Sequence, residues 1–258
     1  MLVQAIPLFQ DAHILRRSML EALSDYAFLT NQYLYKGYSE GILSGCDLTT
    51  TEDTIVLNEG IVLYGGQLFL IKEPMSVEYY PTNTTTVLKM RFSDEMRDAN
   101  FIYREVEMIL TKQTEVQKGE IELCRFKLQE GARLRYKYQD FEDRNTEFDT
   151  LNVIHAPFAA PGKSTLSSDI TKSFARQMLL LDSISDLDEM FCIQILSQER
   201  AINKEALRVY LERRNKTELE DYSNLGIYKE LSRILKEGSS GKSKAKVQAK
   251  KEWRLTVE

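Results

Sequence analysis

The sequence contains few of the side chains that common metal and nucleophile sites require. Its 258 residues include two histidines, His13 and His155, and three cysteines, Cys46, Cys124 and Cys192. The cysteines are odd in number and widely spaced, form no CxxC pair and have no histidine close by, which argues against a disulfide framework or a zinc site. We expect three small buried thiols in a reducing compartment.

Motifs that bind nucleotides or present a nucleophile are also absent. No GxGxxG, GxxxxGK[ST] or GxSxG occurs anywhere in the chain. Asp and Glu are abundant, at 39 residues, but no carboxylate pair stands out from surface charge as glycan hydrolysis would require. An acidic cluster, 140–149, lacks the glycine and the terminal glutamate of a calcium loop. The sequence therefore predicts a protein that is not an enzyme and has no catalytic residue, cofactor or metal.

Membranes and nucleic acids are not predicted partners. No apolar run approaches the roughly 20 residues that span a bilayer, and the apolar N-terminus, which has no Lys or Arg before Arg16, is too short for a secretion signal. The net charge of −5 argues against a general nucleic-acid binder. The positive charge is concentrated at the end, where 238–258 carry +4 and leave −9 on the first 237 residues. We expect synthesis in the cytoplasm.

Residues 1–40 are predicted to form an extended segment and a helix. After Pro7, Asp11 is a plausible N-cap, and apolar residues recur at helical spacing over about 11–35, followed by glycines that end the helix. The residues of this face are Leu15, Met19, Leu23, Tyr26 and Leu34.

Residues 41–139 are predicted to form an antiparallel β domain. Period-two alternation separated by short turns gives seven candidate strands: Thr54–Leu57, Gly60–Tyr64, Gln67–Lys72, Thr86–Phe92, Phe101–Thr111, Glu120–Leu128 and Ala132–Tyr138. The strongest local signal is Gly65-Gly66, which supplies the two positive-φ positions of a tight hairpin turn. Gly45 and Gly60 are further predicted structural turns. The reactive candidates nearby, Ser44, Cys46 and Asp47, have no visible partner in the sequence.

The rest of the chain is predicted to consist of a linker, a helical domain and an arm. Residues 140–165, acidic and then rich in Pro and Gly, are predicted as a linker or exposed loop. Helical periodicity returns over 166–237, with Thr217 and Glu220 as a capping box and Gly238 as a helix stop. Residues 238–258 have the composition of a flexible basic arm ending in a strand-like segment. We hypothesise that Trp253, Leu255 and Val257 dock this arm on a neighbouring subunit.

The expected fold class is thus α+β, with an N-terminal helix, an antiparallel β-sandwich or small barrel, and a C-terminal helical bundle with an extended tail. Two stretches carry a family resemblance. The run Gly41–Cys46 with Asp53–Val56 and Gly60–Leu68 resembles the "SGC … pGi…dG.l" module near the start of baseplate and tail-fibre proteins in phages and phage-derived particles of Gram-positive bacteria. Gly119–Leu128 resembles the strand that closes this module, so that the resemblance covers about 40–139.

The resemblance implies a structural subunit of a phage-like tail baseplate that connects or positions neighbouring baseplate or fibre subunits. It also implies partners among those subunits, a homo-oligomer or other symmetric assembly, and a final location in a virion or tailocin-like contractile particle. An alternative is a receptor-binding module of a tail fibre that recognises a cell-surface glycan. Four tyrosines are candidates for an aromatic platform in that case: Tyr79, Tyr80, Tyr136 and Tyr138.

Overall fold

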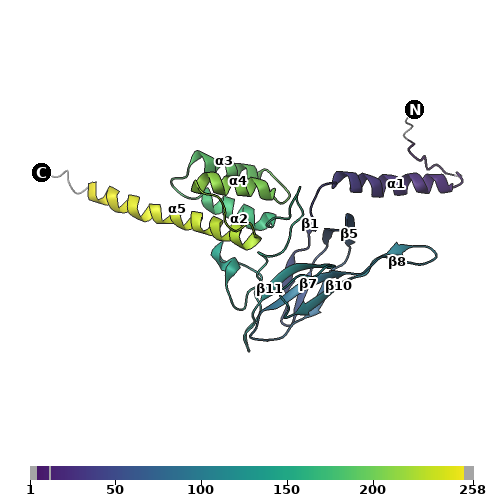
Figure 1. The fold of residues 1–258 in the computed structure, drawn as a ribbon, viewed down its shortest axis with the longest axis horizontal. Helices are drawn as coiled ribbons and strands as arrows, with labels where there is room; N and C mark the ends of the chain where they lie inside the picture. Colours follow the sequence, from purple (N-terminus) through teal and green to yellow (C-terminus); the bar gives the residue numbers. More distant parts are fainter. Residues whose placement is uncertain (1–4, 12, 253–258) are drawn as a thin grey trace.

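The computed structural model describes residues 5–11 and 13–252, and its fold class is the predicted α+β. An N-terminal helix, α1, stands out from one side of a β region, and four helices, α2–α5, gather on the other side (Figure 1). The C-terminal helix α5 points away from the body in the direction opposite to α1 (Figure 1). The two long helices thus extend from opposite ends of the molecule.

Helix α1 spans Arg17–Leu34, so it begins six residues after the predicted N-cap. The residue at the N-cap is Arg16, which makes no side-chain capping bond, and Asp11 lies in a turn further upstream. None of the 18 residues of α1 is buried. The sequence correctly indicated an amphipathic helix, but α1 makes only a short contact with β5 and leaves most of its apolar face exposed.

The β region consists of small antiparallel sheets that share one core. The orders are β1-β4-β5, β2-β3-β6 and β10-β7-β11, with a separate β8-β9 ribbon. The strands are β1 Gly41–Gly45, β2 Leu48–Thr50, β3 Thr54–Leu57, β4 Gly60–Tyr64, β5 Gln67–Ile71, β6 Met75–Glu78, β7 Thr86–Phe92, β8 Met96–Arg97, β9 Ile102–Tyr103, β10 Val106–Thr111 and β11 Glu120–Phe126. Side chains from all three sheets, including Ile55, Val62, Leu88 and Leu123, fill a single hydrophobic cluster.

The predicted hairpin is confirmed. Gly65 and Gly66 have φ of 57° and 72°, and Tyr64 pairs with Gln67 across the turn between β4 and β5. These values are those of a primed turn, whose twist matches that of the flanking strands.

Two strand predictions were wrong in this region. Ala132–Tyr138 forms no strand, because only Arg135 bridges to a neighbour, Thr150. The run 101–111 is divided into two strands, β9 and β10, by Arg104 and Glu105, which belong to neither strand.

The stretch 140–165 is packed and not the exposed loop that its composition indicated. Phe141 belongs to the helical core, whereas Leu151 and Ala156 belong to the β core. Isolated bridges such as Phe158 to Thr165 hold its backbone against itself and against β1. This stretch therefore joins the two cores.

The helical part contains α2 Ser168–Met178, α3 Asp186–Leu196, α4 Lys204–Asn215 and α5 Asn224–Glu252. Its core includes the predicted Ile170, Phe174 and Met178. The predicted capping box at Thr217 is wrong. The capping box of this region is instead at the start of α3, where Ser185 and Asp188 satisfy each other's backbone N–H groups.

Gly238 does not end a helix, and α5 continues through it to Glu252. A Cβ at Gly238 would lie 2.4 Å from Leu181 Cδ1, so this glycine allows close packing. The Lys, Ala and Gln residues that follow are good helix formers. The region predicted as a flexible arm is therefore helical as far as Glu252, while Trp253, Leu255 and Val257 lie outside the described residues.

Candidate functional site

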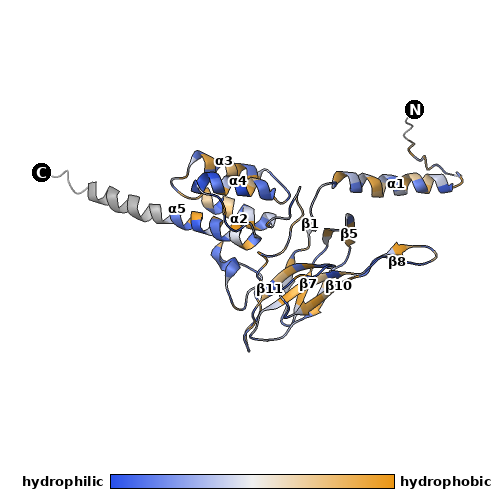
Figure 2. Cartoon of the chain, viewed as in Figure 1, coloured by the Kyte–Doolittle hydropathy of each residue, from blue (hydrophilic) through white to orange (hydrophobic). Residues whose placement is uncertain are grey.

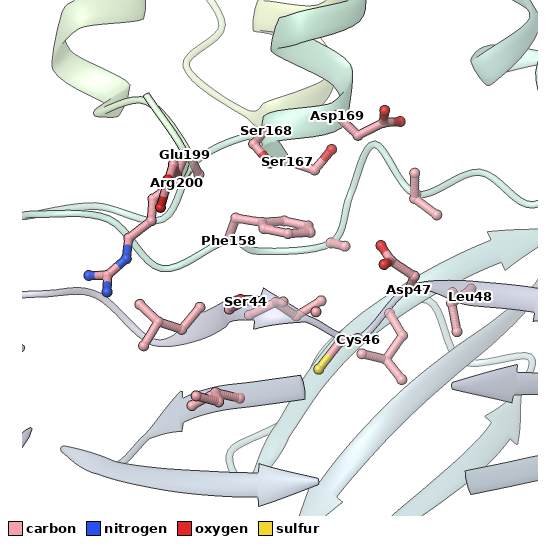
Figure 3. A pocket seen from close by; sticks show the side chains of 18 of the residues that line it. Ser44, Cys46, Asp47, Leu48, Phe158, Ser167, Ser168, Asp169, Glu199 and Arg200 are labelled. Carbon is pink, nitrogen blue, oxygen red and sulfur yellow. The ribbon is translucent and has the colours of Figure 1, made fainter. Parts of the chain in front are cut away.

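A cleft of about 570 Å³ lies where β1 faces the linking stretch and the start of α2 (Figure 3). Its walls combine aromatic, hydroxyl and charged side chains from segments far apart in the sequence. The polar and aromatic residues around it are Tyr35, Ser44, Asp47, Tyr136, Tyr138, Phe158, Ser167, Ser168, Asp169, Glu199 and Arg200. The fold thus brings the reactive candidates near Cys46 to one wall of this cleft.

The shape of this wall depends on close approach of β1 and β4. Gly45 has φ +63°, and a Cβ there would lie 2.3 Å from the Glu59 carbonyl oxygen. A Cβ on Gly60 would lie 2.4 Å from Cys46 N and 2.5 Å from Cys46 Sγ. Because real Cβ atoms do not approach other atoms this closely, both positions admit only glycine without movement of the backbone. The predicted structural role of Gly45 and Gly60 thus has a geometric basis, namely the close approach of the two paired strands where these glycines lie opposite each other.

Cys46 is unsuited to act as a nucleophile here. Its side chain is buried, and burial, with the nearby charge of Asp47, raises the pKa of the thiol to about 12. The thiolate is the reactive form of cysteine, and it would be scarce near neutral pH. No hydrogen bond among the described residues joins Ser44 Oγ or Cys46 Sγ to a histidine or a carboxylate.

Two of the four charged residues around the cleft make structural contacts. Asp169 pairs with Arg144 at 2.8 Å, and the Arg144 guanidinium stacks on Tyr138 at 4.4 Å from the ring centroid. Arg200 donates a hydrogen bond of 2.9 Å to the Tyr35 hydroxyl and lies over the same ring. These contacts tie the base of α1 and the linking stretch to the helical part.

Neither histidine reaches the cleft. His13 lies before α1, and His155 lines a separate groove beside Arg125, where burial and then the Arg125 charge lower its pKa. Within residues 5–11 and 13–252, no group of three His, Cys, Asp or Glu side chains is placed to hold a metal ion. The described helices also include none with the length and apolar content needed to cross a bilayer.

The four tyrosines predicted as a glycan platform do not form one surface. Tyr79 is buried, and its hydroxyl donates to the Thr51 and Glu52 carbonyls. Tyr80 is 71% exposed and lies apart from the cleft lining. Tyr136 and Tyr138 both line the cleft, where the Tyr138 hydroxyl donates to the Leu151 carbonyl at 2.7 Å. The structure therefore brings two of the four together.

Two helices expose large apolar side chains away from the cleft. Helix α1 exposes leucines and tyrosines along its length (Figure 2). Helix α3 buries Phe191, Cys192 and Ile195 but leaves Met190 71% and Ile193 56% exposed. A sequence signal existed for α3, because its second half, 190–196, is apolar at every position except Gln194, a pattern typical of a helix that is covered all round.

Comparison with known proteins gives little similarity. No family model matches the sequence, and no curated protein is similar to it. A solved structure of TssK aligns over 92% of this chain and 72% of its own chain, at 11% identity and a TM-score of 0.39. A likeness at that level establishes neither a shared family nor a shared function. The resemblance of 40–139 to the phage module stays a prediction.

Proposed function

We propose that this chain is a structural subunit of the baseplate of a phage-like tail or related contractile injection system, without enzymatic activity. It would connect or position neighbouring subunits and would be made in the cytoplasm before assembly into the particle. The observation that carries the proposal is α1, an amphipathic helix of 18 residues with no buried residue. A soluble monomer rarely leaves such a face uncovered, whereas an assembly component covers it with a neighbour.

The second exposed surface, on α3, supports the same proposal. It lies on the helical part, on an element separate from α1 (Figure 1). A connector needs at least two separate contact faces, and these two are carried by different elements on different cores. The contacts of Arg200 with Tyr35 fix the base of α1 to the helical part, so that the two faces are held in a defined relation.

The proposal is tested by sedimentation from cells that make the protein. An antibody to the chain should detect it in the particle fraction at a fixed ratio to a tail protein, and label should lie at the tail tip in electron micrographs. As the control, the same antibody is applied to particles from cells lacking the gene for this chain. Recovery of the chain only in the soluble fraction would contradict the proposal.

A second candidate function is glycan binding, and the cleft is the observation that favours it. Tyr136 and Tyr138 lie there beside hydroxyl and carboxylate groups of Ser167 and Asp169, a combination suited to sugar faces and hydroxyls. The test is a titration with cell-surface polysaccharide fragments, with Tyr136→Ala as the cleft variant and Tyr80→Ala as the control on an exposed tyrosine elsewhere. Saturable binding lost only in Tyr136→Ala supports this function, and absence of saturable binding argues against it.

A further inference from the structure

The apolar residues of α1 form one continuous surface. At 3.6 residues per turn, Met19, Leu20, Leu23, Tyr26 and Ala27 fall within the same half of the helix circumference. Ala22, Leu29, Tyr33 and Leu34 fall there too. We call this half the α1 apolar face, and its exposed members are Leu20, Leu23, Tyr26, Leu29, Tyr33 and Leu34, at 44–70%.

The charges of the helix lie on the opposite half. Arg17 and Glu21 form an i,i+4 ion pair with an N–O distance of 2.6 Å, and Asp25 follows on the same side. A membrane-surface helix carries Lys and Arg on its polar face, and this polar face has more acidic than basic residues. A lipid surface therefore fits α1 poorly, and a protein surface fits it better.

The spacing along the face is that of helices that pack against copies of themselves. Met19, Ala22, Tyr26, Leu29 and Tyr33 follow one another at intervals of 3, 4, 3 and 4 residues. This is the heptad pattern in which each seam residue inserts between four residues of a facing helix. The flanking Leu20, Leu23 and Leu34 widen the face beyond a two-stranded seam, so that each helix can contact two others.

The area of the face matches that of a stable interface. The six exposed members together present roughly 700 Å², taking about 200 Å² for a fully exposed side chain of this size. Specific interfaces bury about 800 Å² per partner, and a typical monomer has no apolar patch above about 600 Å². Burial of the α1 apolar face alone would therefore supply most of the area that one partner buries in a specific interface.

We propose that the α1 apolar face is covered by the same face of other copies of this chain, so that the protein self-associates through a bundle of at least three α1 helices. This goes beyond the proposed function, which leaves the neighbouring subunit unidentified. The base of each helix is held by Tyr35, which stacks edge-on against Tyr38 and pairs with Arg200, so the bodies would be arranged around the bundle in a fixed orientation.

The first test is the mass of the purified full chain by size-exclusion chromatography with light scattering. The wild type should be an oligomer, and the double variant Leu23→Glu, Tyr26→Glu should be a monomer. The matched control is Phe28→Glu, because Phe28 is 74% exposed but lies on the polar half. It should remain an oligomer. All three proteins should give the same far-UV circular dichroism, since none of these residues is buried.

The second test is disulfide cross-linking. Cys46, Cys124 and Cys192 are all buried, so a cysteine placed on α1 is the one accessible to oxidant in the described chain. If the helices of the bundle are parallel, two copies of Met19→Cys should cross-link to each other, and so should two copies of Tyr33→Cys. If the helices are antiparallel, Met19→Cys should instead cross-link to Tyr33→Cys in a mixture of the two variants. Absence of cross-links in all three samples would contradict the proposal.

Other occupants of the face give different results. A monomeric wild type that still sediments with particles would overturn self-association and leave the proposed function standing, with a different protein as the partner. A Met190→Glu variant that becomes monomeric would also overturn the proposal, since it would place α1 against α3 of a neighbouring copy. An oligomeric wild type that fails to sediment with particles would contradict the proposed function and not the self-association.

Discussion

The close approach of β1 to β4 at Gly45 predicts that Gly45 and Gly66, two glycines with similar backbone angles, tolerate substitution by alanine very differently. Gly45 and Gly66 have φ of 63° and 72°, so alanine at either position pays the left-handed cost of roughly 1–2 kcal/mol. Replacing either glycine by alanine also reduces the conformational entropy of the unfolded chain by the same amount. Only the space differs, since a Cβ at Gly66 meets nothing within 4 Å and one at Gly45 lies 2.3 Å from the Glu59 carbonyl oxygen.

Overpacking of this kind typically costs about 1–3 kcal/mol, and here the obstacle is backbone that cannot rotate away. We therefore expect Gly66→Ala to lower the free energy of unfolding by about 1–2 kcal/mol and Gly45→Ala by about 2–5 kcal/mol. Urea titration followed by far-UV circular dichroism measures both, and hydrogen exchange of the β4 peptide tests whether the loss is local. Equal losses in the two variants would refute the claim that the strands must approach this closely.

Three further predictions concern other parts of the molecule. The carboxylate of Glu120 is buried against Lys89 at 2.9 Å and is hydrogen-bonded to Arg91, and these bonds outweigh the effect of burial and lower its pKa to about 2. Its contribution to the free energy of unfolding should therefore be lost as pH falls from about 4.5 to 2, by at most about 1.4 kcal/mol per pH unit. Glu120→Gln should flatten this pH dependence in acid unfolding curves. The three buried thiols should react with a maleimide only on unfolding, and rapid labelling of the native chain would contradict the burial of Cys46. Met190→Glu should leave the free energy of unfolding, from urea titration, within about 0.5 kcal/mol of the wild type, because the Met190 side chain is 71% exposed, yet it should reduce recovery with particles. A large loss of stability would show that α3 is not free to dock.

The parts of the fold that were predictable are those specified by neighbouring residues. The β4–β5 hairpin follows from Gly65-Gly66 and the alternation on each side, and β7 runs over the predicted Thr86–Phe92. Helix α2 likewise follows from local periodicity, and the Ser167 hydroxyl oxygen caps its N-terminus by accepting a hydrogen bond from the Ile170 backbone N–H.

The missed elements depend on distant partners. Strand β6, Met75–Glu78, is short and follows a proline, and it exists because it pairs with β3 about twenty residues earlier. Gly238 signals a helix stop by itself, and only the position of Leu181 shows why a helix passes through it.

The candidate site was only partly visible in the sequence. Ser44, Cys46 and Asp47 could be identified as the reactive groups of their module, but the cleft is completed by Asp169 and Arg200 from other segments. The same limit applies to α1, whose apolar pattern predicts a helix with a covered face. Whether the cover comes from the same chain or from a neighbour depends on tertiary structure, and here the described chain leaves the face open.

The central claim, that this chain assembles into particles through α1, is tested most directly in the producing cells. Cells carrying Leu23→Glu, Tyr26→Glu in place of the wild-type chain are compared with cells carrying Phe28→Glu, and complete tails are counted by electron microscopy after matched expression is verified. The account predicts wild-type numbers of complete tails with Phe28→Glu and a large loss with the double variant. Normal numbers of complete tails with the double variant would contradict it.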